Sequence, residues 1–336
     1  MTLDASPEAA LAAWPQAAGL PLIPVPQGLI NRTWAVGAQP RFALQLVHPQ
    51  FGEAENARIE SAGALLAAQG LRSPRLVPTP GGALSTPGPE GRRWRLAGWL
   101  PGASFDRLPS PAHARSAGRL LARFHDALAT LPGLADAAFH DTAGRMADLA
   151  RAQAESRDDP MRRLAEAILA AWRTWRAEEP QPVAPRPGHG DPKLSNFLFE
   201  DGEATAVIDL DTLGLFRIDD ELGDALRSWC NPAGEDAAVR LDEAAFAAAV
   251  GGYLSGAARL SAAERARIVH GFGRIALELA ARFCADAHDD RYWSWNPVVA
   301  PSRKAHNMLR AARQLDLARL VMARRARLEE IVRTSG

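Results

Sequence analysis

The chain has 336 residues, of which 47% are hydrophobic and 23% are charged, and its 39 basic residues are balanced by 39 acidic ones. This length is sufficient for two lobes with a core each, and the composition is that of an ordinary globular protein. Because the chain carries no net charge that would attract nucleic acid or an anionic membrane, we expect neither as a partner.

The cysteines and the N-terminal region bear on the cellular setting. Cys230 and Cys284 are the only cysteines, too few for a disulfide framework or a zinc cluster, so we expect a reducing, cytoplasmic environment. The charge-free stretch over residues 9–30 is interrupted by four prolines, and no basic segment precedes it. That pattern argues against a membrane span and against a signal peptide.

The first hundred residues predict an antiparallel sheet crossed by a helix. A short helix is expected over residues 5–19, which begin with a capping serine and a proline, and a longer one over residues 53–69, where apolar residues recur at helical spacing. Strands are predicted at 25–28, 33–36, 41–47, 75–77, 83–85 and 92–100. Because side chains alternate along a strand, Ala43 and Gln45 share one face of the third strand and Leu44 lies on the other.

Beyond Gly102 the pattern changes to helices. Caps and apolar residues at helical spacing predict helices at 110–128, 142–156, 160–178, 219–227, 235–254, 261–285 and 302–332. His125 lies beside the apolar stripe of the first of these, so we expect a hydrogen-bonded core residue. The acidic run at 286–290 falls between two predicted helices and is predicted to be a solvated loop.

Residues 188–211, GHGDPKLSNFLFEDGEATAVIDLD, are the stretch whose residue types answer to one chemistry. That chemistry is phosphoryl transfer, in which a carboxylate at Asp191 takes the proton of an attacking hydroxyl and Lys193 sets a positive charge on the phosphate. A turn at residues 201–202 predicts a hairpin that returns Asp209 to the side of Asn196. An amide oxygen and a carboxylate are ligands that magnesium prefers.

Two other roles are open for residues of this stretch and its surroundings. Asp191 and Asn196 also fit turn caps, although their joint spacing favours the catalytic interpretation. His189 suits a structural brace of the loop better than a base. Asp224 fits either a supporting contact to the loop or a capping or buried structural role.

The order His-Gly-Asp-x-Lys-x-x-Asn, hairpin, Ile-Asp resembles the catalytic and metal-binding loops of the protein-kinase-like superfamily, in the version found in aminoglycoside phosphotransferases. The resemblance implies an α+β, bilobal fold, with a small nucleotide-binding lobe at residues 1–100 and a large helical catalytic lobe at 101–336. The hinge would lie at residues 99–102. ATP and Mg²⁺ are the implied cofactors, and the nucleotide would contact Gly28, Asn31, Ala43, Gln45, Trp99 and Leu100.

Four further segments are similar to the N-acetylhexosamine 1-kinase branch of this family, whose members phosphorylate the anomeric hydroxyl of a sugar. The segments are 28–34, 42–45, 208–212 with 223–227, and 306–310. In the last of these, His306 and Arg310 are four residues apart and share a helix face. The resemblance implies that both contact a sugar acceptor, with Asp191 at the reacting hydroxyl.

Two departures from the family keep alternatives open. Gln45 occupies the place of the lysine that the family's kinases elsewhere carry on the third strand, and no lysine precedes Lys193. Leu29 stands where the sugar kinases often have a histidine. The substrate could instead be an amino alcohol, choline or an aminoglycoside, and acidic residues lining the cleft would favour such a cationic substrate. The missing lysine is also compatible with a catalytically silent nucleotide-binding protein.

Overall fold

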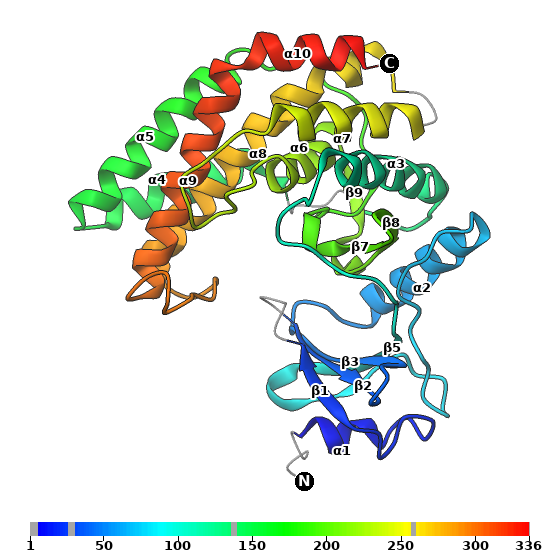
Figure 1. Cartoon of the computed structure of the whole chain (residues 1–336). Helices are drawn as coiled ribbons and strands as arrows, with labels where there is room; N and C mark the ends of the chain where they lie inside the picture. The colour runs from blue at the N-terminus through cyan, green and yellow to red at the C-terminus, as the bar shows by residue number, and fades with distance from the viewer. Residues whose placement is uncertain (1–5, 26–30, 136–139, 257–259, 336) are drawn as a thin grey trace.

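A computed structural model describes residues 6–25, 31–135, 140–256 and 260–335. It has a five-stranded antiparallel sheet near the N-terminus and a mainly helical remainder (Figure 1), which confirms the predicted α+β, bilobal fold. The strand order is β1-β2-β3-β5-β4, with β1 at Leu22–Val25, β2 at Arg32–Val36, β3 at Phe42–Val47, β5 at Arg93–Gly98 and β4 at Thr86–Pro87. The predicted division at residue 100 falls between β5 and the first long helix of the large lobe, and it stays a prediction.

The two faces of the sheet have different partners, as the alternation in β3 predicts. Leu44 lies in a small core with Trp14 and Leu96, on the side of α1 (Pro7–Leu11). Gln45 points to the opposite face and lines a large cleft. Helix α2 (Glu53–Ala68) buries its apolar residues in the larger core, which continues through the helical lobe.

The large lobe consists of helices around the hairpin of residues 197–207. Its helices are α3 (Pro111–Leu128), α4 (Thr142–Glu155), α5 (Asp159–Arg176), α6 (Ile218–Trp229), α7 (Glu243–Gly256), α8 (Ala262–Asp289), α9 (Arg303–Ala323) and α10 (Arg325–Thr334). Strands β7 (Phe197–Glu200) and β8 (Glu203–Val207) form the predicted hairpin, which lies between the sheet and the helices in Figure 1. A second strand pair joins β6 (Arg186–Gly188), which leads into the catalytic loop, to β9 (Gly214–Phe216). No helix within the described ranges is both long and apolar enough to cross a membrane.

Several predicted boundaries were wrong. Helix α1 ends at Leu11, shortly before Pro15, because a proline cannot continue a helix. The segment at 75–77 contributes one bridge, from Leu76 to Ala97, and the strand predicted at 83–85 is displaced to β4 beyond the turn at Gly81–Gly82. The helix predicted from residue 235 begins at Glu243, after a non-helical segment.

The two largest corrections concern helix ends. The helix predicted over 302–332 is divided at Arg324, whose backbone (φ −105°, ψ 5°) separates α9 from α10. Helix α8 continues to Asp289, so the acidic run is largely helical and was wrongly predicted as a solvated loop. Asp286 is buried and accepts hydrogen bonds from the backbone amides of Tyr292 and Trp293 at 2.9 and 3.0 Å. It therefore fixes the loop after α8, which forms part of the cleft wall.

Candidate active site

A cleft of about 1110 Å³ collects residues from both lobes. The sheet and the connection after it contribute Asn31, Ala43, Gln45, Arg95, Trp99 and Leu100, and the helical lobe contributes Asp191, Lys193, Asn196, Asp209, Asp211 and Arg310. Of the residues predicted for the site, Gly28 lies outside the described ranges, as does Leu29, and His306 lies behind the cleft wall. The others line one cavity.

The start of the catalytic loop is anchored by Glu221 on α6. The carboxylate accepts the backbone N–H groups of His189 and Gly190, each at 2.7 Å, and also contacts His125 Nε2 at 3.0 Å. A side chain at Gly188 would meet Glu221 at 2.7 Å, so only glycine fits there. His125 is thus the predicted hydrogen-bonded core residue, whereas the anchoring role of Glu221 was missed because no local motif marks it.

His189 braces the loop, as predicted. Its Nε2 atom donates to the carbonyl oxygen of Ile208 at 2.9 Å, and its Nδ1 atom accepts the backbone N–H of Asp191 at 3.2 Å. Ile208 directly precedes Asp209 in the chain. One imidazole therefore ties the loop that carries Asp191 to the segment that carries Asp209.

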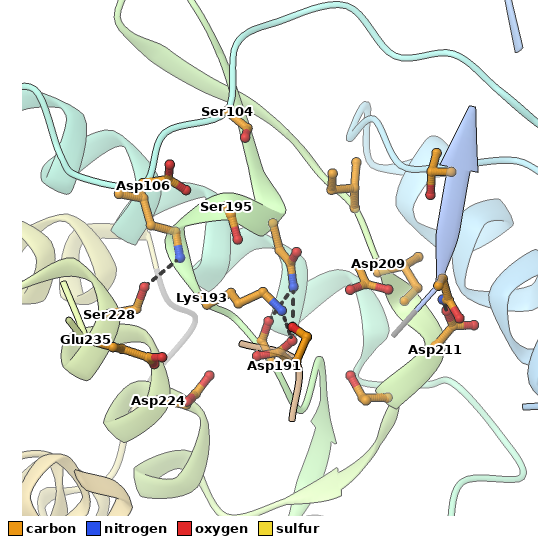
Figure 2. A pocket seen from close by; sticks show the side chains of 18 of the residues that line it. Ser104, Asp106, Asp191, Lys193, Ser195, Asp209, Asp211, Asp224, Ser228 and Glu235 are labelled. Atoms are coloured by element: carbon orange, nitrogen blue, oxygen red, sulfur yellow. Dashed lines mark hydrogen bonds and ion pairs between the residues drawn. The ribbon is translucent and has the colours of Figure 1, made fainter. Parts of the chain in front are cut away.

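Asp191 and Lys193 form an ion pair at the centre of the cleft (Figure 2), with 2.5 Å between Nζ and Oδ2. Asn196 Nδ2 donates to the backbone carbonyl of Asp191 at 2.8 Å, which fixes the turn between them. Burial disfavours the charged form of Asp191, but the Lys193 ammonium outweighs burial and lowers the pKa of the carboxyl below its ordinary value. Asp191 is therefore a carboxylate at neutral pH.

The hairpin returns Asp209 to the side of Asn196, as the spacing predicts. Ile208 N–H donates to the carbonyl oxygen of Asn196 at 2.9 Å, and Asp209 follows in the left-handed conformation (φ 65°, ψ 56°). Burial raises the pKa of Asp209; Lys193 opposes this, and the carboxylates of Asp211 and Asp191 raise it further, so the net shift is upward.

The donor set at Asp209 and Asn196 fits a divalent cation. No described residue donates a hydrogen bond to the half-buried Asp209 carboxylate, and a partly desolvated carboxylate without a donor favours a positive partner. The amide nitrogen of Asn196 is turned to Asp191, so its side-chain oxygen remains as a ligand. Two hard oxygen donors of this kind suit Mg²⁺.

Asp211, two residues after Asp209, joins the lobes. Its two carboxylate oxygens accept from Arg95 Nη1 and Nη2 on β5 at 2.5 and 2.8 Å, and Asn31 Nδ2 donates to it at 2.8 Å. Gln45 Oε1 in turn accepts from Arg95 Nε at 2.9 Å. Gln45 lines the cleft on the predicted face of β3, but it is bonded to Arg95, which the sequence did not place there.

His140 supports the catalytic loop from the opposite side. Its Nε2 atom lies 3.1 Å from the carbonyl oxygen of Gly190, and its Nδ1 atom lies 3.0 Å from a carboxylate oxygen of Glu278. Both partners are acceptors, so both ring nitrogens carry protons. Although burial lowers it, the Glu278 carboxylate raises the pKa of His140 above its ordinary value. No sequence pattern connects residues so far apart.

One end of the cleft is built from acids paired with basic residues. Asp236 accepts from His306 Nε2 at 2.6 Å and from Arg310 Nε at 3.4 Å. His306 is fully buried, so it reaches the cleft through Asp236 and through Asn296, whose backbone N–H donates to His306 Nδ1 at 3.1 Å. Arg227 binds both Asp224, at 2.8 Å, and Glu235, at 2.9 Å.

The structure also places Asp224 and the predicted hinge residues Trp99 and Leu100. Asp224 and Glu235 lie on the other side of Asp191 from Asp209 and Asp211 (Figure 2). Asp224 thus has the buried structural partner that was one of its two predicted roles, and its negative charge also raises the pKa of Lys193, against the effect of burial. At the predicted hinge, the backbone N–H of Trp99 donates to the carbonyl oxygen of Arg41 at 3.0 Å, so it is not free for a ligand. Leu100 lies beyond Gly98, the last residue of β5 that pairs with β3.

The fold and the cleft define a kinase-like phosphotransferase: a small sheet-bearing lobe faces a helical lobe whose loop and hairpin bring Asp191, Lys193, Asn196 and Asp209 together. A comparison with family models gives the same result, since the model described as APH, phosphotransferase enzyme family, matches residues 21–259. The chain belongs to this family. It is therefore an enzyme, a kinase that transfers phosphate to a hydroxyl group of a small molecule.

Solved structures share the fold over nearly the whole chain. A choline/ethanolamine kinase family protein from Mesorhizobium loti is 21% identical with a TM-score of 0.61, covering 97% of each chain. An aminoglycoside phosphotransferase from Alicyclobacillus acidocaldarius is 16% identical with a TM-score of 0.61, again covering 97% of each chain. A microcompartment-associated aminopropanol kinase is 20% identical with a TM-score of 0.62, covering 94% of this chain and 96% of its own. At these sequence identities the comparison shows a shared fold and nothing more specific.

Proposed function

We propose that the enzyme transfers the γ-phosphate of ATP to a hydroxyl of an uncharged sugar or sugar-like metabolite, in the manner of the N-acetylhexosamine 1-kinases that segments of its sequence resemble. The observation that carries the choice of acceptor is the pairing of acids at one end of the cleft. Asp236 is bonded to His306 and Arg310, and Arg227 is shared by Asp224 and Glu235. An acid held by a basic partner presents less charge to a cationic substrate than a free acid does.

In this proposal Asp191 orients the acceptor hydroxyl and takes its proton as the new O–P bond forms and the bond to the leaving ADP breaks. Its low pKa is no obstacle, because phosphoryl transfer has a loose transition state in which positioning and charge stabilisation dominate. Lys193, 2.5 Å away, holds the carboxylate in place and presents its remaining N–H donors to the transferring phosphoryl group.

Asn196 and Asp209 are proposed to hold Mg²⁺. When bound there, the ion would neutralise charge on the phosphate oxygens of the nucleotide. The upward shift of the pKa of Asp209, caused by burial and by the neighbouring carboxylates, supports this assignment, since a cation relieves the same repulsion. Ala43, Gln45, Trp99 and Leu100 are proposed to form the nucleotide side of the cleft.

An amino alcohol is the second candidate acceptor, and a separate observation favours it. Tyr292, Trp293 and Trp295 line the same cleft, and aromatic rings bind alkylammonium groups. One of these rings is already engaged, because the Arg282 guanidinium lies 5.1 Å from the Trp293 ring centroid. Aromatic faces also stack on sugar rings, so these residues fit either acceptor. Asp106, which lines the cleft and forms no ion pair with any described residue, favours the cationic acceptor, whereas the paired acids favour the neutral one.

ADP release with Mg²⁺ and ATP, measured against a panel of acceptors, tests the proposal. The panel holds N-acetylhexosamines, other hexoses, choline, ethanolamine, aminopropanol and an aminoglycoside, and phosphorus NMR identifies the product. Turnover of a sugar supports the proposal, and turnover confined to the amines overturns the acceptor. Asp191→Asn should abolish turnover while leaving ATP binding intact; retained turnover would remove Asp191 from the role of base.

A further inference from the structure

The positive charge that β3 lacks is present on the neighbouring strand. Gln45 occupies the place of the family's lysine, and the strand register pairs it directly with Arg95 on β5. Residues directly opposite each other in an antiparallel pair project from the same face, and Arg95 Nε donates to Gln45 Oε1 at 2.9 Å. Both residues line the cleft that contains Asp191. The guanidinium of Arg95 thus lies beside Gln45, the position at which the family's kinases elsewhere carry a lysine.

The partner of this cation differs from its kinase counterpart in the same way. In protein kinases the lysine of the third strand is held by a glutamate from the following helix. Here that helix, α2, contributes the neutral Asn56, whose Oδ1 accepts from Arg95 Nη1 at 3.3 Å. The carboxylate comes instead from Asp211, in a bidentate pair whose side chains are 4% and 2% exposed. An ion pair is thus present in both cases, but here its cation is on β5 instead of β3, and its anion is Asp211 instead of a residue of the following helix.

We propose that Arg95 is the small-lobe cation that contacts the nucleotide phosphates, with Gln45 and Asp211 as the positioning residues that orient its guanidinium. The inference rests on the proposed function, because it requires ATP as the phosphate donor. An arginine has five N–H donors. The contacts described use one at Nε, two at Nη1 and one at Nη2. One Nη2 donor remains for a phosphate oxygen.

Charge balance explains why a cation is needed on this wall. Asp191, Asp209 and Asp211 all line the cleft, whereas the catalytic loop supplies Lys193 as its positive group. A nucleotide triphosphate would add several negative charges to the same space. Arg95 offsets Asp211 and, because a guanidinium is always charged and forms planar paired contacts, can engage a carboxylate and a phosphate at once.

Removing the charge of Arg95 tests the inference through binding alone. Calorimetric titration of Arg95→Gln with ATP, ADP and adenosine should show a loss of about 10- to 100-fold for the two phosphorylated ligands, the range expected for a hydrogen bond to a charged group. Adenosine affinity should stay within about twofold of wild type, since adenosine has no phosphate. Arg93→Gln is the matched control: Arg93 lies on the same strand, bonds Ser85 at 2.6 Å and does not line the cleft, so its removal should leave all three affinities unchanged.

A second variant keeps the inference testable if Arg95→Gln unfolds, since that change leaves Asp211 buried without its cation. Gln45→Lys added to Arg95→Gln returns a positive charge to β3, and thermal unfolding monitors the fold of each variant. Recovery of most of the ATP affinity supports the proposal. It is overturned by equal losses for ATP and adenosine, by no loss in folded Arg95→Gln, or by a folded double variant without recovery. Wild-type protein that binds no ATP would instead refute the proposed function, and the inference with it.

Discussion

Glu221→Gln is the substitution that most directly probes the support of the catalytic loop. The carboxylate accepts the amides of His189 and Gly190 at 2.7 Å each, from a side chain that is about 1% exposed, and it also contacts His125. Glutamine keeps the shape but presents one oxygen and one NH₂ group. One of the two backbone amides must then face another donor in a buried site, and both lose a charged acceptor.

The expected loss of stability follows from those contacts. A buried donor left without a partner costs about 1–3 kcal/mol, and a hydrogen bond to a charged group contributes about 1.5–3 kcal/mol. Since some relaxation offsets these losses, we expect the free energy of unfolding to fall by about 2–5 kcal/mol. The loop precedes Asp191 directly, and a displacement of about 1 Å at a reacting group can reduce the rate by about 10²-fold.

Denaturant unfolding and steady-state kinetics on folded protein measure the two effects. Asp219→Asn is the matched control, because Asp219 is equally buried on α6 but pairs with Arg267, at 2.9 and 3.0 Å, and not with the loop. The control should lose stability while kcat stays near the wild-type value. If Glu221→Gln lowered stability and kcat no more than the control does, the carboxylate would not be what positions the loop.

Three further predictions concern the cleft. Asp209→Ala should abolish the dependence of ATP affinity on magnesium, because the carboxylate is proposed to bind the metal; calorimetry with and without Mg²⁺ that showed an unchanged dependence would remove that role. Arg310→Ala should raise KM for the acceptor with little change for ATP, since the guanidinium lines the cleft beside Asp236, and equal effects on both would contradict acceptor contact. The raised pKa of His140 means that its imidazolium stabilises the fold below its ordinary value of 6.5 and that this contribution disappears as pH rises through the folded value. Unfolding free energies of wild type and His140→Gln should therefore converge at alkaline pH, and parallel curves would refute the charge assignment.

The parts of the site that could be predicted are those that local geometry determines. A hairpin with a short turn fixes its own register, so the spacing from Asn196 to Asp209 implies that they meet, and the Ile208 N–H bond to the Asn196 carbonyl at 2.9 Å is the result. Strand alternation likewise assigned Gln45 to the cleft face and Leu44 to the core. Short-range periodicity contains this information in full.

The parts that were missed depend on contacts between distant segments. Arg95 and Asp211 are 116 residues apart, and nothing near either residue indicates the other. The sequence shows that Gln45 replaces the lysine of the third strand, but it does not show that Arg95 on β5 lies beside Gln45, because a motif does not report a cation on a different strand. The division at Arg324 was missed for a related reason: neither glycine nor proline marks it, and packing against the rest of the lobe sets the direction of α10.

The position of Asp211 has a consequence for how the lobes act together. Asn31 and Arg95 of the small lobe both bind its carboxylate, which follows Asp209 by two residues. Hydrogen bonds to a charged group in a buried site resist displacement, because an unpaired buried charge costs several kcal/mol. A change in the angle between the lobes would therefore either break these bonds or move the segment that carries Asp209. A change in the angle between the lobes and the position of Asp209, the carboxylate proposed to bind the metal, are thus coupled through Asp211.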